Sequence, residues 1–84
     1  MLSYEEKLLE FIQTYDDTIT DLIEFKIKDY RDKYGRSNEH LICKVLKMEW
    51  NDTIGDYAII EKECLVRIST FEKWCEERYG VIFL

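Results

Sequence analysis

The chain has 84 residues and no proline, carries a formal net charge of −6, and is 46% apolar and 36% charged. This composition is typical of a small globular domain and excludes an intrinsically disordered chain. Three cysteines without tight spacing argue against a disulfide framework, and no apolar run approaches the ~20 residues of a membrane-spanning helix. We expect one domain over residues 1–84 that is soluble and cytoplasmic, because the N-terminus resembles neither a secretory signal nor a transit peptide.

The net charge lies entirely in the first quarter of the chain. Residues 1–24 contain seven acids and one base, which sum to −6, and the other eleven acids and eleven bases cancel. A concentrated acidic surface repels nucleic acid and anionic membranes and attracts basic partners. The charge pattern therefore predicts a basic protein as partner, with no direct contact to nucleic acid or membrane.

The first predicted element is one long helix over residues 3–33. Its apolar residues recur at steps of three, four and seven, the period of a helix that buries one face: they are Leu8, Phe11, Ile12, Tyr15, Ile19, Leu22, Ile23 and Tyr30. The weak helix formers of residues 14–18 could cap a second helix. A break would reset the phase of the apolar positions, so the unbroken phase favours one helix, bent at most.

Five carboxylates share the polar side of this predicted helix and form an acidic stripe: Glu6, Glu10, Asp17, Asp21 and Glu24. A solvated helix commonly carries stabilising Glu–Lys pairs, yet Lys7 is the sole base before residue 26. The stripe is therefore predicted to bind a partner, with an ordinary solvated face as the alternative.

Residues 40–50 and 57–68 are predicted to form a β-hairpin. Pairing Trp50 with Tyr57 places Cys43 opposite Cys64 and Lys44 opposite Glu63, so that apolar and polar residues alternate across the two faces. One face then carries Leu41, Cys43, Val45, Ala58, Ile60, Cys64, Val66 and Ile68, and the other carries Lys44, Glu61, Glu63, Arg67, Met48, Trp50, Tyr57 and Ile59. A helix over residues 40–50 also fits the apolar pattern.

The C-terminal region favours the hairpin. Ser69 and Glu72 have the spacing of a capping box, which predicts a helix over residues 70–79 that Gly80 ends. The last four residues, 81–84, are apolar strand formers that need a sheet edge. The predicted fold is α+β in the order α-β-β-α-β.

Residues 64–80 faintly resemble the turn and recognition helix of a helix-turn-helix, with Val66, Phe71 and Trp74 at core positions. This resemblance implies an all-α alternative fold and a DNA-binding regulator. Leu65 stands where the turn usually has glycine, and Glu61 stands where a small residue is usual. The candidate recognition helix is also net negative, whereas a DNA reader needs a basic footprint.

Catalysis and metal binding have little support. There is one histidine, His40, and the three glycines stand alone, so no phosphate-binding loop exists. A zinc site would need His40, Cys43, Cys64 and Cys75, which lack the paired spacing of structural zinc sites. We therefore expect no enzyme, no metal and no cofactor.

The expected function is that of a small acidic protein-binding module. By analogy of class, such modules include phage anti-CRISPR and anti-restriction proteins, antitoxins and nuclease-immunity proteins, which inhibit basic nucleic-acid-handling proteins as nucleic-acid mimics. The acidic stripe would supply attraction, with Trp50 and Tyr57 as interface anchors. The alternatives are the DNA-binding regulator, a non-catalytic subunit of a larger assembly, and a homodimer paired through the long helix.

Overall fold

The computed structural model describes residues 2–80. Two helices flank three strands along the chain: α1 (Tyr4–Gln13), β1 (Ile19–Arg31), β2 (Ser37–Asn51), β3 (Asp56–Arg67) and α2 (Ile68–Tyr79). The strands form one antiparallel sheet in the order β1-β2-β3. The predicted α-β-β-α-β order is therefore wrong, and so is the all-α alternative.

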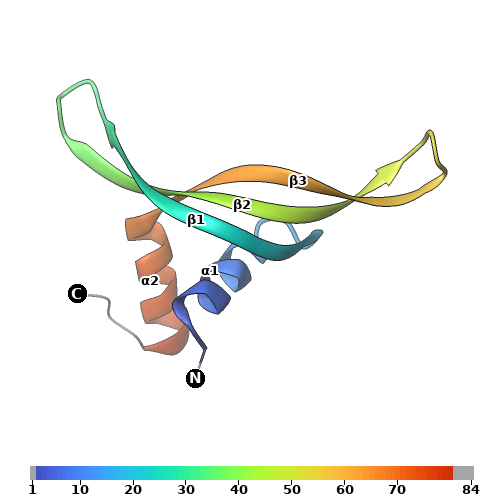
Figure 1. Cartoon of the computed structure of the whole chain (residues 1–84). Helices are drawn as coiled ribbons and strands as arrows, with labels where there is room; N and C mark the ends of the chain where they lie inside the picture. The colour runs from blue at the N-terminus through green and yellow to red at the C-terminus, as the bar shows by residue number, and fades with distance from the viewer. Residues whose placement is uncertain (1, 81–84) are drawn as a thin grey trace.

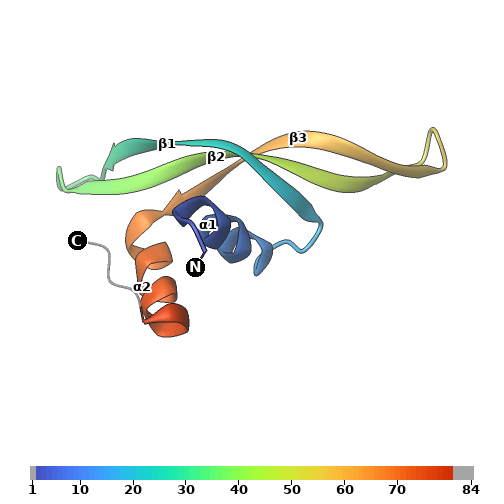
Figure 2. The same cartoon turned by 60° about the horizontal axis from the view of Figure 1, so that its bottom comes forward.

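The fold has two layers, because both helices lie on the same face of the sheet (Figures 1 and 2). The helices and the sheet bury one apolar core between them: Leu8, Phe11, Ile12, Ile19, Leu41, Cys43, Val45, Val66, Phe71 and Cys75. Phe71 is fully buried, and its ring centroid lies 5.3 Å from that of Tyr4 and 5.4 Å from that of Phe11. Within residues 2–80, no element covers the other face of the sheet, which we call the open face.

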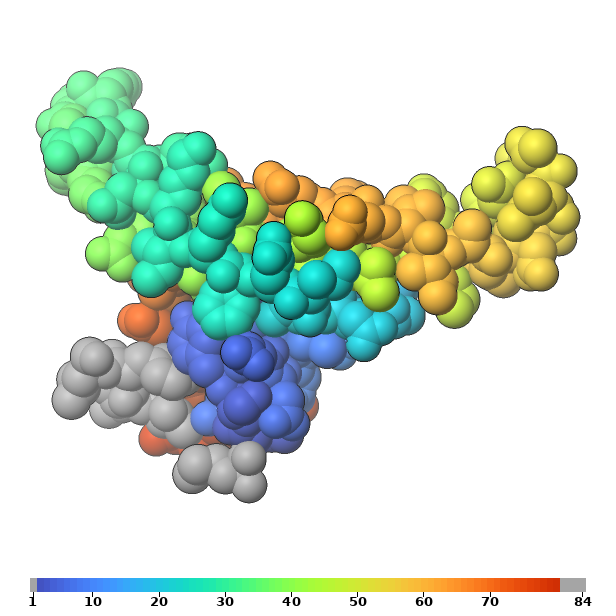
Figure 3. All heavy atoms as spheres, in the orientation of Figure 1, coloured from blue at the N-terminus to red at the C-terminus, as the bar shows by residue number. Residues whose placement is uncertain are grey.

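The β1–β2 hairpin and the β2–β3 hairpin project from opposite ends of the sheet (Figure 3). Residues 37–39 of β2 pair only with β1, and residues 48–51 pair only with β3. The molecule is consequently elongated, with extents of 46 × 36 × 18 Å. Neither helix described within residues 2–80 is long and apolar enough to cross a membrane.

Helix α1 is short because capping groups define both of its ends. The Ser3 side chain accepts a hydrogen bond from the Glu6 backbone amide, and Glu6 accepts one from the Ser3 amide, which completes a capping box. At the other end the Thr14 hydroxyl donates to the Phe11 carbonyl oxygen at 2.6 Å. The residues expected at most to bend a long helix therefore end it.

Asp16 organises the connection from α1 to β1. Its carboxylate accepts hydrogen bonds from the amide and hydroxyl of Thr18 and lies 2.9 Å from the Lys47 ammonium. The hydrogen bonds from Thr18 and Lys47 lower the pKa of Asp16 to about 2. The Asp16–Lys47 ion pair thus links the connection to β2.

We expect the Asp16 carboxylate to stabilise the protein most above pH ~4, its unfolded pKa. Because the pKa is lower in the folded state, this stabilisation is lost as the pH falls from about 4 to about 2. Asp16→Asn should therefore lower stability at neutral pH and flatten the loss between those pH values. Urea unfolding as a function of pH measures this, with the exposed neighbour Asp17→Asn as control. Equal acid profiles in the two variants would contradict the assignment.

Strand β1 corrects the prediction of a long helix over residues 3–33. Its pairing with β2 shifts register between Ile19 and Asp21 and again between Leu22 and Glu24, so each shift adds one residue to β1 as a bulge. The two bulges place Ile19, Leu22 and Phe25 on the helix-covered face at steps of three. The step of three from Ile19 to Leu22 matches a helical period, so these two residues continued the apolar pattern on which the long helix was predicted.

The predicted hairpin register between β2 and β3 is confirmed. Trp50 pairs with Tyr57, Cys43 with Cys64, and Lys44 with Glu63. Leu41, Cys43 and Val45 are buried beneath the helices, as the alternation of apolar residues predicts.

Helix α2 begins two residues earlier than predicted and does not use the expected cap. Its N-cap is Arg67, which makes no side-chain capping hydrogen bond, so the Ser69 capping box is wrong. Gly80 ends the helix with a φ of 68°, as predicted. Because residues 64–67 belong to β3, the helix-turn-helix resemblance does not hold. The predicted strand over residues 81–84 lies outside the described residues.

Candidate functional site

The strand register assigns each side chain to one face of the sheet. Directly paired residues of antiparallel strands project to the same side, and Leu41, Cys43 and Val45 face the helices. The alternate residues of β2 and their partners therefore make up the open face: Asp21, Glu24, Lys26, Lys28, Tyr30, Asn38, His40, Ile42, Lys44, Leu46, Met48, Trp50, Tyr57, Ile59, Glu61, Glu63, Leu65 and Arg67.

The apolar end of the open face lies on the β2–β3 hairpin, beyond the start of β1. Trp50 pairs with Tyr57, and Met48 pairs with Ile59. The rings of Trp50 and Tyr57 meet edge to face at a centroid distance of 5.2 Å. All four side chains are exposed, Trp50 by 52% and Tyr57 by 60%. Exposed aromatic and apolar side chains grouped in this way are typical of a protein interface.

The acidic middle of the open face adjoins this apolar end. Asp21 and Glu24 of β1 and Glu61 and Glu63 of β3 flank Lys44 of β2. The Lys44 ammonium lies 3.3 Å from the Glu24 carboxylate. Its pKa is raised first by the hydrogen bond to Glu24 and then by the charges of Glu24, Glu61 and Glu63. Four carboxylates and one ammonium leave this region with a charge of −3.

The opposite end of the open face is basic. Lys26, Lys28 and Arg67 project there, and the Arg67 guanidinium donates to the Asn38 side chain at 2.6 Å. The acids Asp29 and Glu39 of this hairpin pair with each other and face the other side of the sheet. The open face therefore changes along its length from apolar to acidic to basic.

The structure divides the predicted site residues between two sides of the sheet. Asp21, Glu24, Trp50 and Tyr57 share the open face, whereas the other three predicted carboxylates lie elsewhere: Glu6 and Glu10 on α1, and Asp17 in the connection to β1. The continuous stripe is wrong because the helix that would carry it does not exist.

Glu6 and Glu10 are also engaged within the molecule. Glu6 belongs to the capping box of α1. Glu10 lies 2.6 Å from the Arg78 guanidinium and accepts a hydrogen bond from the Tyr79 hydroxyl. The hydrogen bond from Tyr79, together with the charge of Arg78, lowers the pKa of Glu10. Glu6 therefore fixes the start of α1, and Glu10 joins α1 to α2.

Sequence reasoning missed Glu61 and Glu63 as members of the candidate site. The signal was present, because the predicted hairpin register already placed them on the face of Trp50 and Tyr57. In the structure Lys44 forms its ion pair with Glu24 of β1, which lies on the other side of β2 from Glu61 and Glu63.

The four residues considered for zinc do not meet at one site, although Cys43 and Cys64 are paired across β2 and β3. His40 projects from the open face, whereas Cys43 is buried beneath the helices. No group of three or more His, Cys, Asp or Glu side chains within residues 2–80 is arranged to hold a metal ion.

Comparisons with protein-family models, with curated proteins and with solved structures find no match to this chain.

Proposed function

We propose that this protein is a small protein-binding module whose partner is a basic protein that docks on the apolar end and acidic middle of the open face. The observation that carries the proposal is that the four carboxylates of the acidic middle share the open face, and adjoin its apolar end, with the exposed side chains of Met48, Trp50, Tyr57 and Ile59. Such a surface complements an apolar pocket bordered by lysines and arginines.

The two regions would contribute differently to binding. The charge of −3 in the acidic middle would attract a basic partner over a distance and raise the association rate. The aromatic rings would supply the buried contact area that slows dissociation. The basic end at Lys26, Lys28 and Arg67 would repel the same partner, so it orients the partner toward the other two regions.

The partner class that we propose is a nucleic-acid-handling protein, inhibited by occupation of its nucleic-acid site. A protein that binds phosphates must present a basic surface, and an acidic face can occupy that surface in place of nucleic acid. The exposed apolar side chains would add contacts that nucleic acid does not make. In this proposal the protein acts as an inhibitor of the anti-CRISPR, anti-restriction, antitoxin or nuclease-immunity type.

Charge reversal in the acidic middle of the open face tests the proposal. The protein is used to capture its partner from the cell that produces it, and the purified pair is studied by surface plasmon resonance. Glu61→Lys combined with Glu63→Lys should slow association by about tenfold and reduce its salt dependence. Glu76→Lys combined with Glu77→Lys changes the net charge equally on the exposed surface of α2, so it is the matched control.

The same complex decides between an inhibitor and a subunit. An inhibitor should abolish nucleic-acid binding or cleavage by the partner at an equimolar ratio. A complex whose activity is unchanged would instead indicate a non-catalytic subunit. Equal loss of association in the two charge-reversed variants would show that net charge, and not the open face, governs binding.

A further inference from the structure

Cys43 and Cys64 lie directly opposite each other on the neighbouring strands β2 and β3. Both side chains project to the helix-covered face of the sheet. Directly paired residues of antiparallel strands have Cα atoms ~4.5–5.5 Å apart, and disulfides span Cα distances of ~4.4–6.8 Å. The backbone therefore already holds these two cysteines at a separation that a disulfide can bridge.

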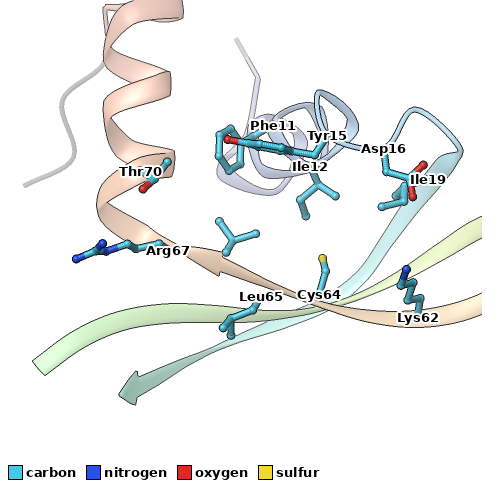
Figure 4. A pocket seen from close by; sticks show the side chains of 11 residues that line it. Phe11, Ile12, Tyr15, Asp16, Ile19, Lys62, Cys64, Leu65, Arg67 and Thr70 are labelled. Atoms are coloured by element: carbon cyan, nitrogen blue, oxygen red, sulfur yellow. The ribbon is translucent and has the colours of Figure 1, made fainter. Parts of the chain in front are cut away.

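The two thiols differ in their access to solvent. Cys43 is fully buried, whereas Cys64 is half-buried. Cys64 lines a cleft of about 310 Å³ between α1, β3 and the start of α2. Figure 4 shows its sulfur pointing from β3 toward Ile12 of α1, with the side chains of Lys62 and Thr70 also lining the cleft. A small neutral molecule that enters this cleft reaches Cys64 first.

The local chemistry favours the thiolate of Cys64. The adjacent Cys43 thiol and, to a lesser extent, the neighbouring Lys62 ammonium favour negative charge on the Cys64 sulfur. These two effects lower the pKa of Cys64 below the ordinary value of a thiol, whereas the neighbouring Cys64 sulfur and burial raise the pKa of Cys43. The thiolate is the reactive form of cysteine. Cys64 is therefore the thiol expected to react first, and Cys43 is the second thiol that reacts with the oxidised Cys64.

We propose that Cys43 and Cys64 form a redox-active pair, which a hydroperoxide converts into an intramolecular disulfide. The Cys64 thiolate attacks the terminal peroxide oxygen and the O–O bond breaks, which leaves Cys64 as a sulfenic acid and expels an alkoxide, or hydroxide from hydrogen peroxide. The expelled anion takes a proton from the solvent and leaves as an alcohol or as water. The Cys43 thiol then attacks the Cys64 sulfur, the S–S bond forms, and water leaves with the thiol proton. Two thiols are thereby oxidised by two electrons, and one peroxide is reduced.

This inference does not depend on the proposed function, because the two thiols lie on the side of the sheet away from the open face. Cys75 is a useful internal comparison. It is also buried, but it lies on α2 and has no directly paired cysteine. Burial raises the pKa of its thiol, which suppresses the reactive form.

Hydrogen peroxide with the reduced full chain tests the proposal. Intact mass should fall by two hydrogen atoms, peptide mapping should identify a Cys43–Cys64 link, and dithiothreitol should restore the original mass. Because the pKa of Cys64 is lowered in the folded protein, the oxidation rate should rise with pH and level off below the ordinary cysteine pKa of ~8.5. Cys75→Ser should oxidise at an unchanged rate.

Two further variants separate the roles of the paired thiols. Cys43→Ser should stop at a sulfenic acid on Cys64, which dimedone traps, and Cys64→Ser should slow oxidation by at least about tenfold. Circular dichroism establishes that each variant is folded. A link to Cys75, a link between chains, or over-oxidation of Cys64 in the wild-type chain would each overturn the proposal.

Discussion

Phe71→Ala is expected to cost about 3–5 kcal/mol of the free energy of unfolding, the largest effect of any single substitution proposed for this chain. Phe71 is fully buried between the two helices, with ring contacts to Tyr4, Phe11 and Trp74. A chain of 84 residues has about 4–13 kcal/mol of stability in total, at ~0.05–0.15 kcal/mol per residue. The variant should therefore be substantially unfolded at elevated temperature.

Urea unfolding followed by far-UV circular dichroism measures this loss. The control is Ile54→Ala, which removes an apolar side chain that is 60% exposed in the turn of the β2–β3 hairpin. The control should change stability by less than about 0.5 kcal/mol, as is usual for surface substitutions. A Phe71→Ala variant within about 1 kcal/mol of the wild type would mean that α2 does not pack against α1 and the sheet as described.

The structure shows where sequence periodicity identifies an element and where it misleads. In β2 and β3 each residue pairs in regular register, so alternation of apolar and polar residues predicted the hairpin down to the Trp50–Tyr57 pair. In β1 two bulges turn a period of two into steps of three at Ile19, Leu22 and Phe25. No local rule distinguishes that spacing from a helix, because the bulges are determined by pairing with β2.

Capping signals were equally ambiguous. Ser3 with Glu6 and Ser69 with Glu72 have the same spacing, yet only the first pair forms a capping box. At the second position the chain passes directly from β3 into α2, and half-buried Ile68 packs against the core within the first turn. Tertiary packing thus sets the start of α2.

The candidate site could be predicted only where the strands were predicted. Trp50 and Tyr57 were recognised because the hairpin register placed them together on a polar face. Glu6 and Glu10 were grouped with Asp21 and Glu24 on a helix that the structure replaces with a helix, a connection and a strand. The open face is nevertheless acidic near Trp50 and Tyr57, because Glu61 and Glu63 from β3 join Asp21 and Glu24 around Lys44.

Trp50→Ala should weaken binding to the partner by about 2 kcal/mol, or about 30-fold, if the open face is the docking surface. The indole stands 52% exposed against the Tyr57 ring, and its Nε1 donates to the Asp52 carboxylate at 2.7 Å. Burial of this ring in a complex would remove a large aromatic surface from water. The loss should appear as faster dissociation, because removing a neutral side chain leaves electrostatic attraction intact.

Surface plasmon resonance on the Trp50→Ala and Glu61→Lys/Glu63→Lys variants separates the two contributions. The first should raise the dissociation rate at every salt concentration, and the second should lower the association rate mainly at low salt. Tyr34→Ala removes an aromatic ring that is 69% exposed at the opposite end of the molecule and serves as the matched control. If Tyr34→Ala dissociates as fast as Trp50→Ala, the docking surface is not the β2–β3 hairpin. The partner would then bind the basic end of the molecule and would have to be acidic, which contradicts the proposal.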